Sequence, residues 1–226
     1  MKVFFIGGTG IISSAVSRLA VERGIELYHF NRGKSHREIE GVKTIQGDMR
    51  NIEETKTKLK DYSFDVVVNW ISFTPDQVLA DIEIFNGMTK QYIFISSASA
   101  YEKSVSKLPI TEETPLINPY WQYSRDKAEC EKILFDAWNT KKFPVTVVRP
   151  SHTYDNTLIP TDWGYTILDR MIRGEKIIIQ GDGTSLWVLT HNSDFAVGFL
   201  GLFGKQEALG EAYHITSDEL LNWNQI

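Results

Sequence analysis

A tyrosine and a lysine one helical turn apart are the residues best suited to chemistry in this 226-residue chain. Tyr123 and Lys127 occur in the segment PYWQYSRDKA, residues 119–128. Residues four apart share a face of a helix, so an ammonium would lie beside a phenol. A nearby positive charge favours the phenolate and lowers the tyrosine pKa from about 10, which would make Tyr123 a usable base near neutral pH. The alternative is a packed tyrosine beside a lysine whose stem snorkels to water.

The helix that must carry this pair is predicted over residues 119–139. Asn118 is a favourable N-cap and Pro119 a favourable first helical residue. The face that holds the pair continues through three further residues, Cys130, Leu134 and Trp138. A lysine on such an apolar stripe is costly to bury without a partner, and the ribose hydroxyls of a bound cofactor would supply one.

A glycine-rich turn near the N-terminus predicts a dinucleotide site. A strand over residues 2–6 leads into GGTGIISS, in which Gly7 and Gly10 open a helix predicted over residues 11–23. Glycine permits a tight turn and lets a diphosphate approach the backbone N–H groups of the helix N-terminus. Ser13 replaces the third glycine of the usual pattern and is small enough to pack in its place. The predicted cofactor contacts in this turn are Gly7, Thr9, Gly10, Ile11 and Ile12.

The ends of the next two strands bear on the choice of cofactor. The segment FNRGK places Asn31 and Arg32 where an acidic residue would bind the ribose hydroxyls of NAD. Arginine can pair with a 2′-phosphate, so NADP is favoured over NAD. The alternative is a surface arginine beside an NAD site without selectivity. Asp48, in GDMRN, either binds the adenine amino group or forms a turn.

The rest of the pattern predicts the α/β class, with a Rossmann-type, doubly wound parallel sheet. Short apolar runs without alternation, typical of strands covered on both faces, alternate with helical stretches. Strands are predicted at 2–6, 26–30, 42–46, 65–69, 92–96 and 145–149. Helices are predicted at 11–23, 53–60, 76–87 and 119–139.

The pattern changes after residue 150. Residues 1–150 are predicted to form a dinucleotide-binding domain that also receives later segments, and residues 151–226 part of a small substrate-binding lobe. Helices near 162–173 and 193–203 flank apolar runs at 176–180 and 186–190, and a strand is predicted at 212–216. The final LLNWNQI has the pattern of a helix start, so we expect the lobe to be incomplete.

Composition narrows the class of protein. The net charge of −5 provides no global attraction to nucleic acid or anionic membrane. The single cysteine, Cys130, excludes an internal disulfide, and no apolar run approaches a membrane span, so we expect a cytoplasmic protein without a membrane partner. No metal site is predicted, because metal-ligand spacing is lacking among His29, His36, His191 and His214. The sequence leaves the oligomeric state open, with a homodimer as one candidate.

Five segments occur in an order that resembles a known family: GGTGIIS, GDMRN, ISSASAY at 95–101, YSRDK at 123–127 and RPSHTY at 149–154. Over nearly the whole chain they resemble the extended short-chain dehydrogenase/reductases, the NAD(P)-dependent epimerase/dehydratase group that acts largely on nucleotide sugars. The resemblance implies a catalytic set of Ser97, Tyr123 and Lys127. It implies hydride transfer at a hydroxyl-bearing carbon of a sugar nucleotide or related small molecule. Members of the family usually extend beyond this length.

The resemblance also implies residues near the nicotinamide and the substrate. Asn69 ends the fourth strand, Pro150 follows the sixth, and both are cofactor candidates. His152 is either a substrate contact or a structural histidine. Many nucleotide-sugar enzymes of the family grip the diphosphate with an arginine four residues before a histidine in the segment resembling GDGTSLWVLTHNSD. Counting back from His191 places Trp187 there. Trp187 could stack on a ring or pack the lobe, which puts the usual substrate in doubt.

Two functions without turnover compete with this one. FNRGK and the GDGTSLW-type segment also resemble the branch of chloroplast stem-loop RNA-binding proteins. The acidic net charge, the lack of a basic stripe with exposed aromatics and the retained Ser-Tyr-Lys set argue against RNA. The third function is a non-catalytic NADP-binding regulator, although such sensors usually lack the tyrosine. We therefore expect a small-molecule substrate and rank nucleic acid behind it.

Overall fold

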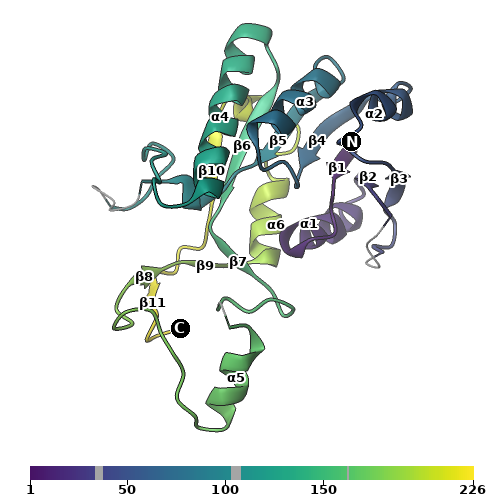
Figure 1. Cartoon of the computed structure of the whole chain (residues 1–226). Coiled ribbons are helices and arrows are strands. Elements are labelled where there is room, and N and C mark those ends of the chain that lie inside the picture. Colours follow the sequence, from purple (N-terminus) through teal and green to yellow (C-terminus); the bar gives the residue numbers. More distant parts are fainter. Residues whose placement is uncertain (34–37, 103–107, 162) are drawn as a thin grey trace.

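In the computed structural model, the chain forms a parallel sheet with helices on both faces and a lobe that projects from one end (Figure 1). The structure describes residues 1–33, 38–102, 108–161 and 163–226. Lys34 of the FNRGK segment, His36, and residue 162 at the start of one predicted helix lie outside the described residues.

Within the described residues the main sheet has seven strands in the order β10-β6-β5-β4-β1-β2-β3, and every neighbouring pair is parallel. The predicted doubly wound sheet is therefore confirmed. β1 lies between β2 and β4, where the winding reverses, and ligands of such sheets bind at the carboxyl ends of the strands at this point. The strands are β1 (Lys2–Ile6), β2 (Glu26–Asn31), β3 (Lys43–Gln46), β4 (Phe64–Asn69), β5 (Thr89–Ile95), β6 (Val145–Pro150) and β10 (Ala212–Ile215).

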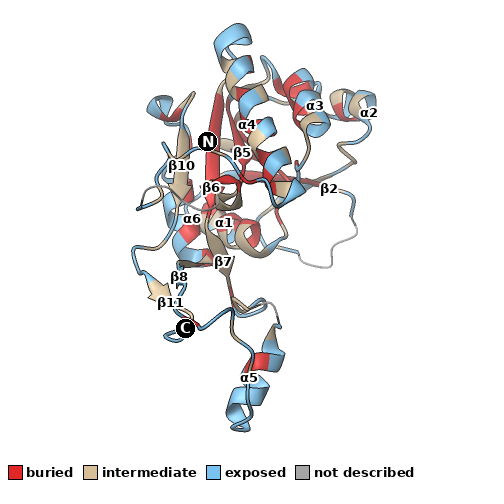
Figure 2. Ribbon diagram, turned by 60° about the vertical axis from the view of Figure 1, so that its left-hand side comes forward, coloured by how far each residue is buried: buried red, intermediate tan, exposed pale blue. Residues whose placement is uncertain are grey.

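The central strands carry apolar side chains on both faces of the sheet. Helices therefore pack against both faces. One face packs against α1 (Ile11–Glu22) and α6 (Asn192–Leu200). The other face packs against α2 (Ile52–Leu59), α3 (Pro75–Phe85) and α4 (Gln122–Lys141). The buried residues accordingly concentrate in the sheet and on the inner sides of these helices (Figure 2).

The segments after residue 150 divide between the sheet and the lobe. β10 pairs with β6, and α6 packs with α1 in the apolar layer on their shared face of the sheet. The lobe contains β7 (His152–Tyr154), α5 (Tyr165–Ile172), β8 (Leu186–Trp187), β9 (Leu189–His191) and β11 (Leu221–Asn222) (Figure 1). The domain boundary near residue 150 stays a prediction.

The apolar run 176–180 forms no strand, and Ile178 is 74% exposed. One prediction for the lobe is wrong. The tail LLNWNQI does not begin a helix. Its residues Leu221 and Asn222 pair with Trp187 and Leu186 of β8 in an antiparallel ribbon. After this ribbon the chain forms a turn, in which Asn222 O accepts from the Gln225 and Ile226 N–H groups at 3.0 and 3.1 Å.

Candidate active site

The turn between β1 and α1 exposes backbone to the cleft. Gly7 and Gly8 have φ angles of +94° and +108°, which strongly favour glycine. A Cβ on Gly8 would lie 2.5 Å from the His29 ring. Ser13 has a role beyond its small size, since its Oγ accepts a hydrogen bond of 2.8 Å from the Gly10 N–H and closes the turn. The φ angles and the close contact with His29 therefore require glycine in this turn.

The first turn of α1 also lacks acidic residues, so nothing local neutralises the positive end of the helix dipole. Of the five contacts predicted here, Gly7 and Thr9 line the cleft, and Gly10 is the N-cap of α1. Ile11 begins the helix, and Ile12 packs against the apolar layer between the sheet and helices α1 and α6. The turn is therefore suited to an anionic group, bound by backbone amides rather than by charged side chains.

A cleft of about 690 Å³ follows the carboxyl ends of β1, β2, β3 and β4. Besides Gly7 and Thr9, its lining includes the predicted contacts Asn31, Arg32, Asp48 and Asn69. Pro150 and Lys127 are not among its lining residues. Most of the predicted cofactor residues thus come from four separate strand ends and meet in one cleft.

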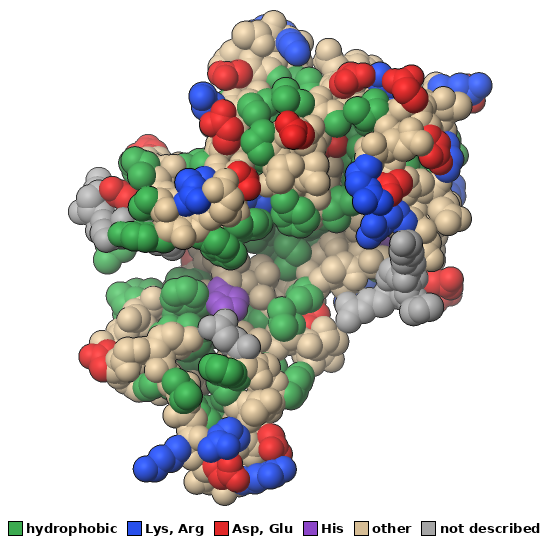
Figure 3. Space-filling view, viewed as in Figure 1, with side chains coloured by type: hydrophobic (Ala, Val, Ile, Leu, Met, Phe, Trp, Pro, Cys, Tyr) green, Lys and Arg blue, Asp and Glu red, His purple; other side chains and the backbone are tan. Residues whose placement is uncertain are grey.

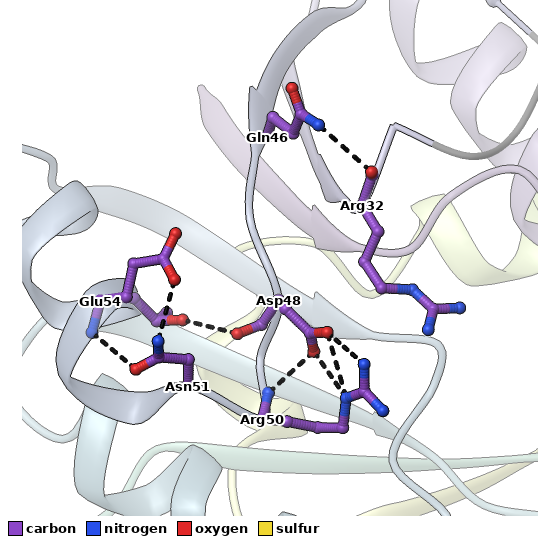
Figure 4. A network of polar contacts seen from close by, with 7 residues as sticks. Arg32, Gln46, Asp48, Arg50, Asn51 and Glu54 are labelled. Carbon is purple, nitrogen blue, oxygen red and sulfur yellow. Dashed lines mark hydrogen bonds and ion pairs between the residues drawn. The ribbon is translucent and has the colours of Figure 1, made fainter.

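At one end of this cleft, Asp48 is held by Arg50 (Figure 4). Arg50 Nε donates to the two carboxylate oxygens at 3.0 and 3.1 Å, and the Arg50 amide donates to one of them at 3.1 Å. These bonds, helped by the charge of Arg32, lower the pKa of Asp48 to about 2. Asp48 therefore forms the turn that was the alternative prediction and lines the cleft as well. Arg50 is absent from the predicted site, although its spacing two residues after Asp48 could have signalled the pair.

Asn69 is fixed within the protein. Its Nδ2 donates to Ser72 Oγ and to Asp81 Oδ2, both at 2.7 Å, and its Oδ1 accepts from the Ile71 and Ser72 amides at 2.8 and 3.0 Å. The Ser72 and Tyr92 hydroxyls also donate to Asp81, whose pKa is raised to about 6 by burial. Because the Asn69 amide is fully used, it contributes to the cleft by shaping the turn after β4.

The helix α4 begins at Gln122, later than the predicted start at Pro119. Asn118 does not cap it. Instead, Asn118 Oδ1 accepts from the Tyr120 N–H at 3.1 Å, and its Nδ2 donates to Ser99 O at 2.8 Å. The asparagine thus forms a local turn and ties the approach to α4 to the serine segment after β5. The predicted apolar face is confirmed, since Lys127, Cys130 and Leu134 are buried together.

Lys127 is 2% exposed, and its Nζ donates to Ser72 O and Ile95 O, both at 2.7 Å. The ammonium therefore links the chain just beyond β4 to the end of β5. It also lies 4.6 Å from the ring centroids of Phe73 and Phe94. Burial lowers the pKa of Lys127 to about 8, so the side chain remains mostly an ammonium at neutral pH. Main-chain carbonyls compensate its burial, and the expected contact with cofactor hydroxyls stays a prediction.

Ser97, Tyr123 and Lys127 meet at this point. Lys127 Nζ lies 5.7 Å from the centroid of the Tyr123 ring, and the Ser97 side chain is near enough to Tyr123 to influence its pKa. Burial raises the pKa of Tyr123 above its ordinary value, and the interaction with Ser97 opposes this shift. The protein by itself therefore keeps Tyr123 protonated. The expected lowering of the Tyr123 pKa, to which a bound nicotinamide would contribute, stays a prediction.

A chain of hydroxyls continues from Ser97. Ser97 precedes the short helix η1 (Ala98–Ala100), and its Oγ donates to Ser99 Oγ at 2.9 Å. Ser124 Oγ, which is buried on α4, donates to the same oxygen at 2.9 Å. Neither Ser99 nor Ser124 is among the predicted site residues. The only sequence signals for these two residues are the Ser-x-Ser spacing from Ser97 to Ser99 and the position of Ser124 next to Tyr123.

The two predicted substrate residues meet in the lobe. Trp187 Nε1 donates to His152 Nδ1 at 2.7 Å, which requires the His152 nitrogen to be unprotonated. Trp187 is 39% exposed and packs on Trp223, with ring centroids 5.4 Å apart. Trp223 escaped prediction because its segment was expected to be helical. Hydrophobic side chains border the hollow between the sheet and the lobe on both sides (Figure 3).

Pro150 connects the two regions of the site. It ends β6, pairs with Ile215 of β10, and leads into β7, which carries His152. Among the described residues, no three His, Cys, Asp or Glu side chains gather as a metal site would need. The described helices also include none with the length and apolar character needed to cross a membrane.

The sequence matches the NAD dependent epimerase/dehydratase family over residues 3–216. The chloroplast stem-loop binding protein of 41 kDa b from Arabidopsis thaliana is 27% identical over 239 residues, which cover 99% of this chain and 60% of that protein. UDP-glucose 4-epimerase from Lactobacillus helveticus is 30% identical over 160 residues, 62% of this chain and 48% of the relative. The chain thus spans 60% and 48% of the length of these two curated relatives.

Solved structures of similar fold include dTDP-glucose 4,6-dehydratase from Bacillus anthracis in complex with NAD. The TM-score is 0.81, and the match covers 100% of this chain and 78% of that chain. Because the sequences are 21% identical, the likeness shows the fold alone.

Proposed function

The chain belongs to the NAD dependent epimerase/dehydratase family, and from this premise we propose that it transfers hydride at a hydroxyl-bearing carbon of a sugar nucleotide or related small molecule. The observation that carries the proposal is the setting of Lys127. Its ammonium is bonded to Ser72 O and Ile95 O and lies beside the ring of Tyr123. Ser72 and its neighbour Phe73 line the dinucleotide-sized cleft, so the cluster adjoins that cleft.

The residues of the cleft fit a dinucleotide. Backbone amides at an uncompensated helix N-terminus suit its diphosphate, and any side chain at Gly8 would collide with His29. Arg32 is exposed at the strand end where a 2′-phosphate would need a cation, so we favour NADP over NAD. When bound, NAD(P) accepts or supplies the hydride.

In this mechanism, Tyr123 moves the proton. As the substrate alcohol is oxidised, the phenolate oxygen of Tyr123 takes the hydroxyl proton, and the electron pair of the C–H bond leaves as hydride. Ser97, which influences the pKa of Tyr123, would orient the substrate oxygen. In this proposal the positive charge of Lys127, beside the Tyr123 ring, would stabilise the phenolate against the burial that raises the pKa of Tyr123.

Recognition of the substrate is assigned to the lobe. Trp187 offers a half-exposed indole for stacking, and His152 is its hydrogen-bonded partner. Trp187 has no positive charge with which to grip a diphosphate. The substrate therefore includes related small molecules as well as sugar nucleotides.

The test begins with binding and ends with turnover. NADPH and NADH are titrated by fluorescence, and a panel of sugar nucleotides and simple alcohols is then screened with the preferred cofactor. Cofactor binding with turnover of at least one alcohol or sugar nucleotide is the expected result. Failure to bind either dinucleotide would refute the proposal, and binding without turnover would favour the NADP-binding regulator.

A second candidate is nucleic-acid binding. It is favoured by the similarity to the stem-loop binding protein of Arabidopsis thaliana across 99% of this chain. The net charge of −5 opposes it, because phosphate contacts need clustered lysines and arginines. A gel shift with structured RNA at moderate salt separates the two functions. A complex that survives this salt and competes with NADPH would favour the second candidate.

A further inference from the structure

Behind Ser97 lies a buried ion pair that the mechanism above does not use. Arg149 of β6 and Glu131 of α4 have side chains that are 6% and 2% exposed. Arg149 Nη2 donates to Glu131 Oε2 at 2.6 Å, and Arg149 Nε donates to the two carboxylate oxygens at 3.1 and 3.2 Å. The pair therefore has the bidentate geometry that fixes direction as well as distance.

The pair reaches Ser97 through the residue that precedes it. Ser96 Oγ donates to Glu131 Oε1, and the Ser96 amide donates to Val148 O at 2.7 Å. Ser96 is 3% exposed, so water does not compete for these bonds. Glu131 lies one helical turn beyond Lys127 on the buried face of α4. One helix thus carries Tyr123, Lys127 and the carboxylate that holds the serine segment.

Arg149 also bonds to the connection between β5 and α4 at residues that follow Ser97. Its Nη1 donates to Glu112 O at 2.9 Å and to the Tyr101 hydroxyl at 3.3 Å. Glu112 Oε1 in turn accepts from the His214 amide of β10 at 2.8 Å. The connection between β5 and α4, which carries Ser97, is therefore fixed to β6 and β10 as well as to α4.

Stability alone gives little reason for such a pair. Taking two charges out of water offsets much of their attraction, and apolar residues of similar volume often stabilise a core as well. Apolar packing, however, would not hold the Ser96 hydroxyl in one direction. What the pair adds is a defined position for the residue before Ser97.

We propose that Glu131 and Arg149 are positioning residues: acting through Ser96, they hold the Ser97 hydroxyl against Tyr123. The inference rests on the proposed function, because it gives the pair a role in hydride transfer. The pair itself touches neither substrate nor cofactor in this role.

The first test is Ser96→Ala, which removes the link and leaves Glu131 paired with Arg149. We expect kcat to fall by tenfold or more, because a small displacement of a catalytic group is enough to slow turnover by about 10²-fold. KM and NADPH affinity should stay within about twofold, since neither the cleft nor the lobe is altered. Equal kcat values for the variant and the unaltered protein would overturn the proposal.

Thr146→Val is the matched control. Thr146 is also buried in the sheet, on β6, where its hydroxyl donates to Ala208 O at 2.8 Å and accepts from Gln91 Nε2 at 2.9 Å. Its loss should destabilise the fold much as Ser96→Ala does but leave kcat unchanged. If kcat fell equally in both variants, the effect would be a general one on the sheet, and the positioning role would be wrong.

A direct readout does not depend on turnover. The protein is labelled with 3-fluorotyrosine, the Tyr123 signal is assigned with Tyr123→Phe, and its titration is followed by fluorine NMR. Because the interaction with Ser97 lowers the pKa of Tyr123, displacing Ser97 in Ser96→Ala should raise that pKa, and Thr146→Val should leave it unchanged. An unchanged titration in Ser96→Ala would overturn the proposal. If the unaltered protein turned over no substrate, hydride transfer would fail, yet this titration would still decide whether Ser96 positions Ser97.

The double variant Glu131→Met, Arg149→Met tests the pair itself. Replacing both charges by apolar side chains avoids a lone buried charge, so the fold should be retained. The variant should show the same loss of kcat and the same shift of the Tyr123 titration as Ser96→Ala. A folded double variant with full activity would overturn the proposal.

Discussion

The two clusters of candidate residues are held in contrasting ways. On α4, against the sheet, Lys127 is 2% exposed and is bonded to main-chain carbonyls at or just beyond the ends of two strands. In the lobe, Trp187 is 39% exposed and depends on His152 and Trp223, which lie on or beside strands of two or three residues. The difference suggests that chemistry and recognition are separable here. The packed core fixes the cluster proposed for proton transfer, and it does not fix the surface proposed to select a substrate.

The sharpest test of this comparison is Tyr123→Phe. Removing the phenol should lower turnover by about 10³-fold, the scale of general acid–base catalysis. NADPH affinity should change by less than about twofold, because the phenol is not among the groups that hold the diphosphate. Initial rates and fluorescence titrations measure the two effects. Tyr120→Phe, at a residue that is 78% exposed, is the control that should keep full activity.

Lys127→Met should have the next largest effect. It removes the ammonium beside Tyr123 and leaves the carbonyls of Ser72 and Ile95 without their donor. Turnover should fall by about 10²-fold. The free energy of unfolding should fall by about 1–3 kcal/mol, the usual cost of buried unpaired polar groups. Urea denaturation measures the second loss, and unchanged stability would show that the two carbonyl bonds do not hold the core cluster.

The pH dependence of stability gives a second measure of Lys127. Burial lowers its pKa from 10.5 to about 8. Between these values the unfolded chain binds more protons than the folded one, so the stability of the folded protein rises with pH, by up to about 1.4 kcal/mol per pH unit. Below the lower value both states are protonated and the effect disappears. The stability difference between the unaltered protein and Lys127→Met should therefore grow above pH 8, and a flat difference would contradict the pKa shift.

Arg32→Gln tests the cofactor cleft at the carboxyl ends of the sheet strands. Loss of the guanidinium should weaken NADPH about tenfold, because hydrogen bonds to charged groups contribute about 1.5–3 kcal/mol. NADH affinity should not change, since NADH lacks the 2′-phosphate. Lys90→Gln, at an exposed lysine paired with Asp65 away from the cleft, controls for the change in net charge. Equal effects on both cofactors would remove the preference for NADP.

The smallest effect is expected in the lobe. Trp187→Phe keeps an aromatic ring but removes the indole N–H that donates to His152. KM should rise about threefold with little change in kcat, as expected when uniform binding is lost. Steady-state kinetics separate the two constants. A fall in kcat comparable to that of Tyr123→Phe would mean that the lobe cluster also takes part in the chemistry.

Several features of the fold and site could be predicted because they depend on local periodicity. The apolar strands predict a doubly wound sheet, and the i, i+4 spacing places Tyr123 and Lys127 on the buried face of α4. The start of α4 could not be predicted from Asn118 and Pro119. Asn118 has a partner in Ser99, and nothing in a local capping pattern shows that such a partner exists.

The sequence by itself determined which residue types and spacings are present: a glycine turn after a strand, a tyrosine and lysine on one helical face, and a tryptophan at position 187. Only the tertiary structure decided their partners. Lys127 finds its acceptors 55 and 32 residues away, at Ser72 and Ile95, and Trp187 finds His152 35 residues away. Backbone periodicity acts over a few residues, whereas the Lys127 contacts arise because parallel strands bring their carboxyl ends to one edge of the sheet. Trp187 reaches His152 because β9, just after Trp187, pairs with β7.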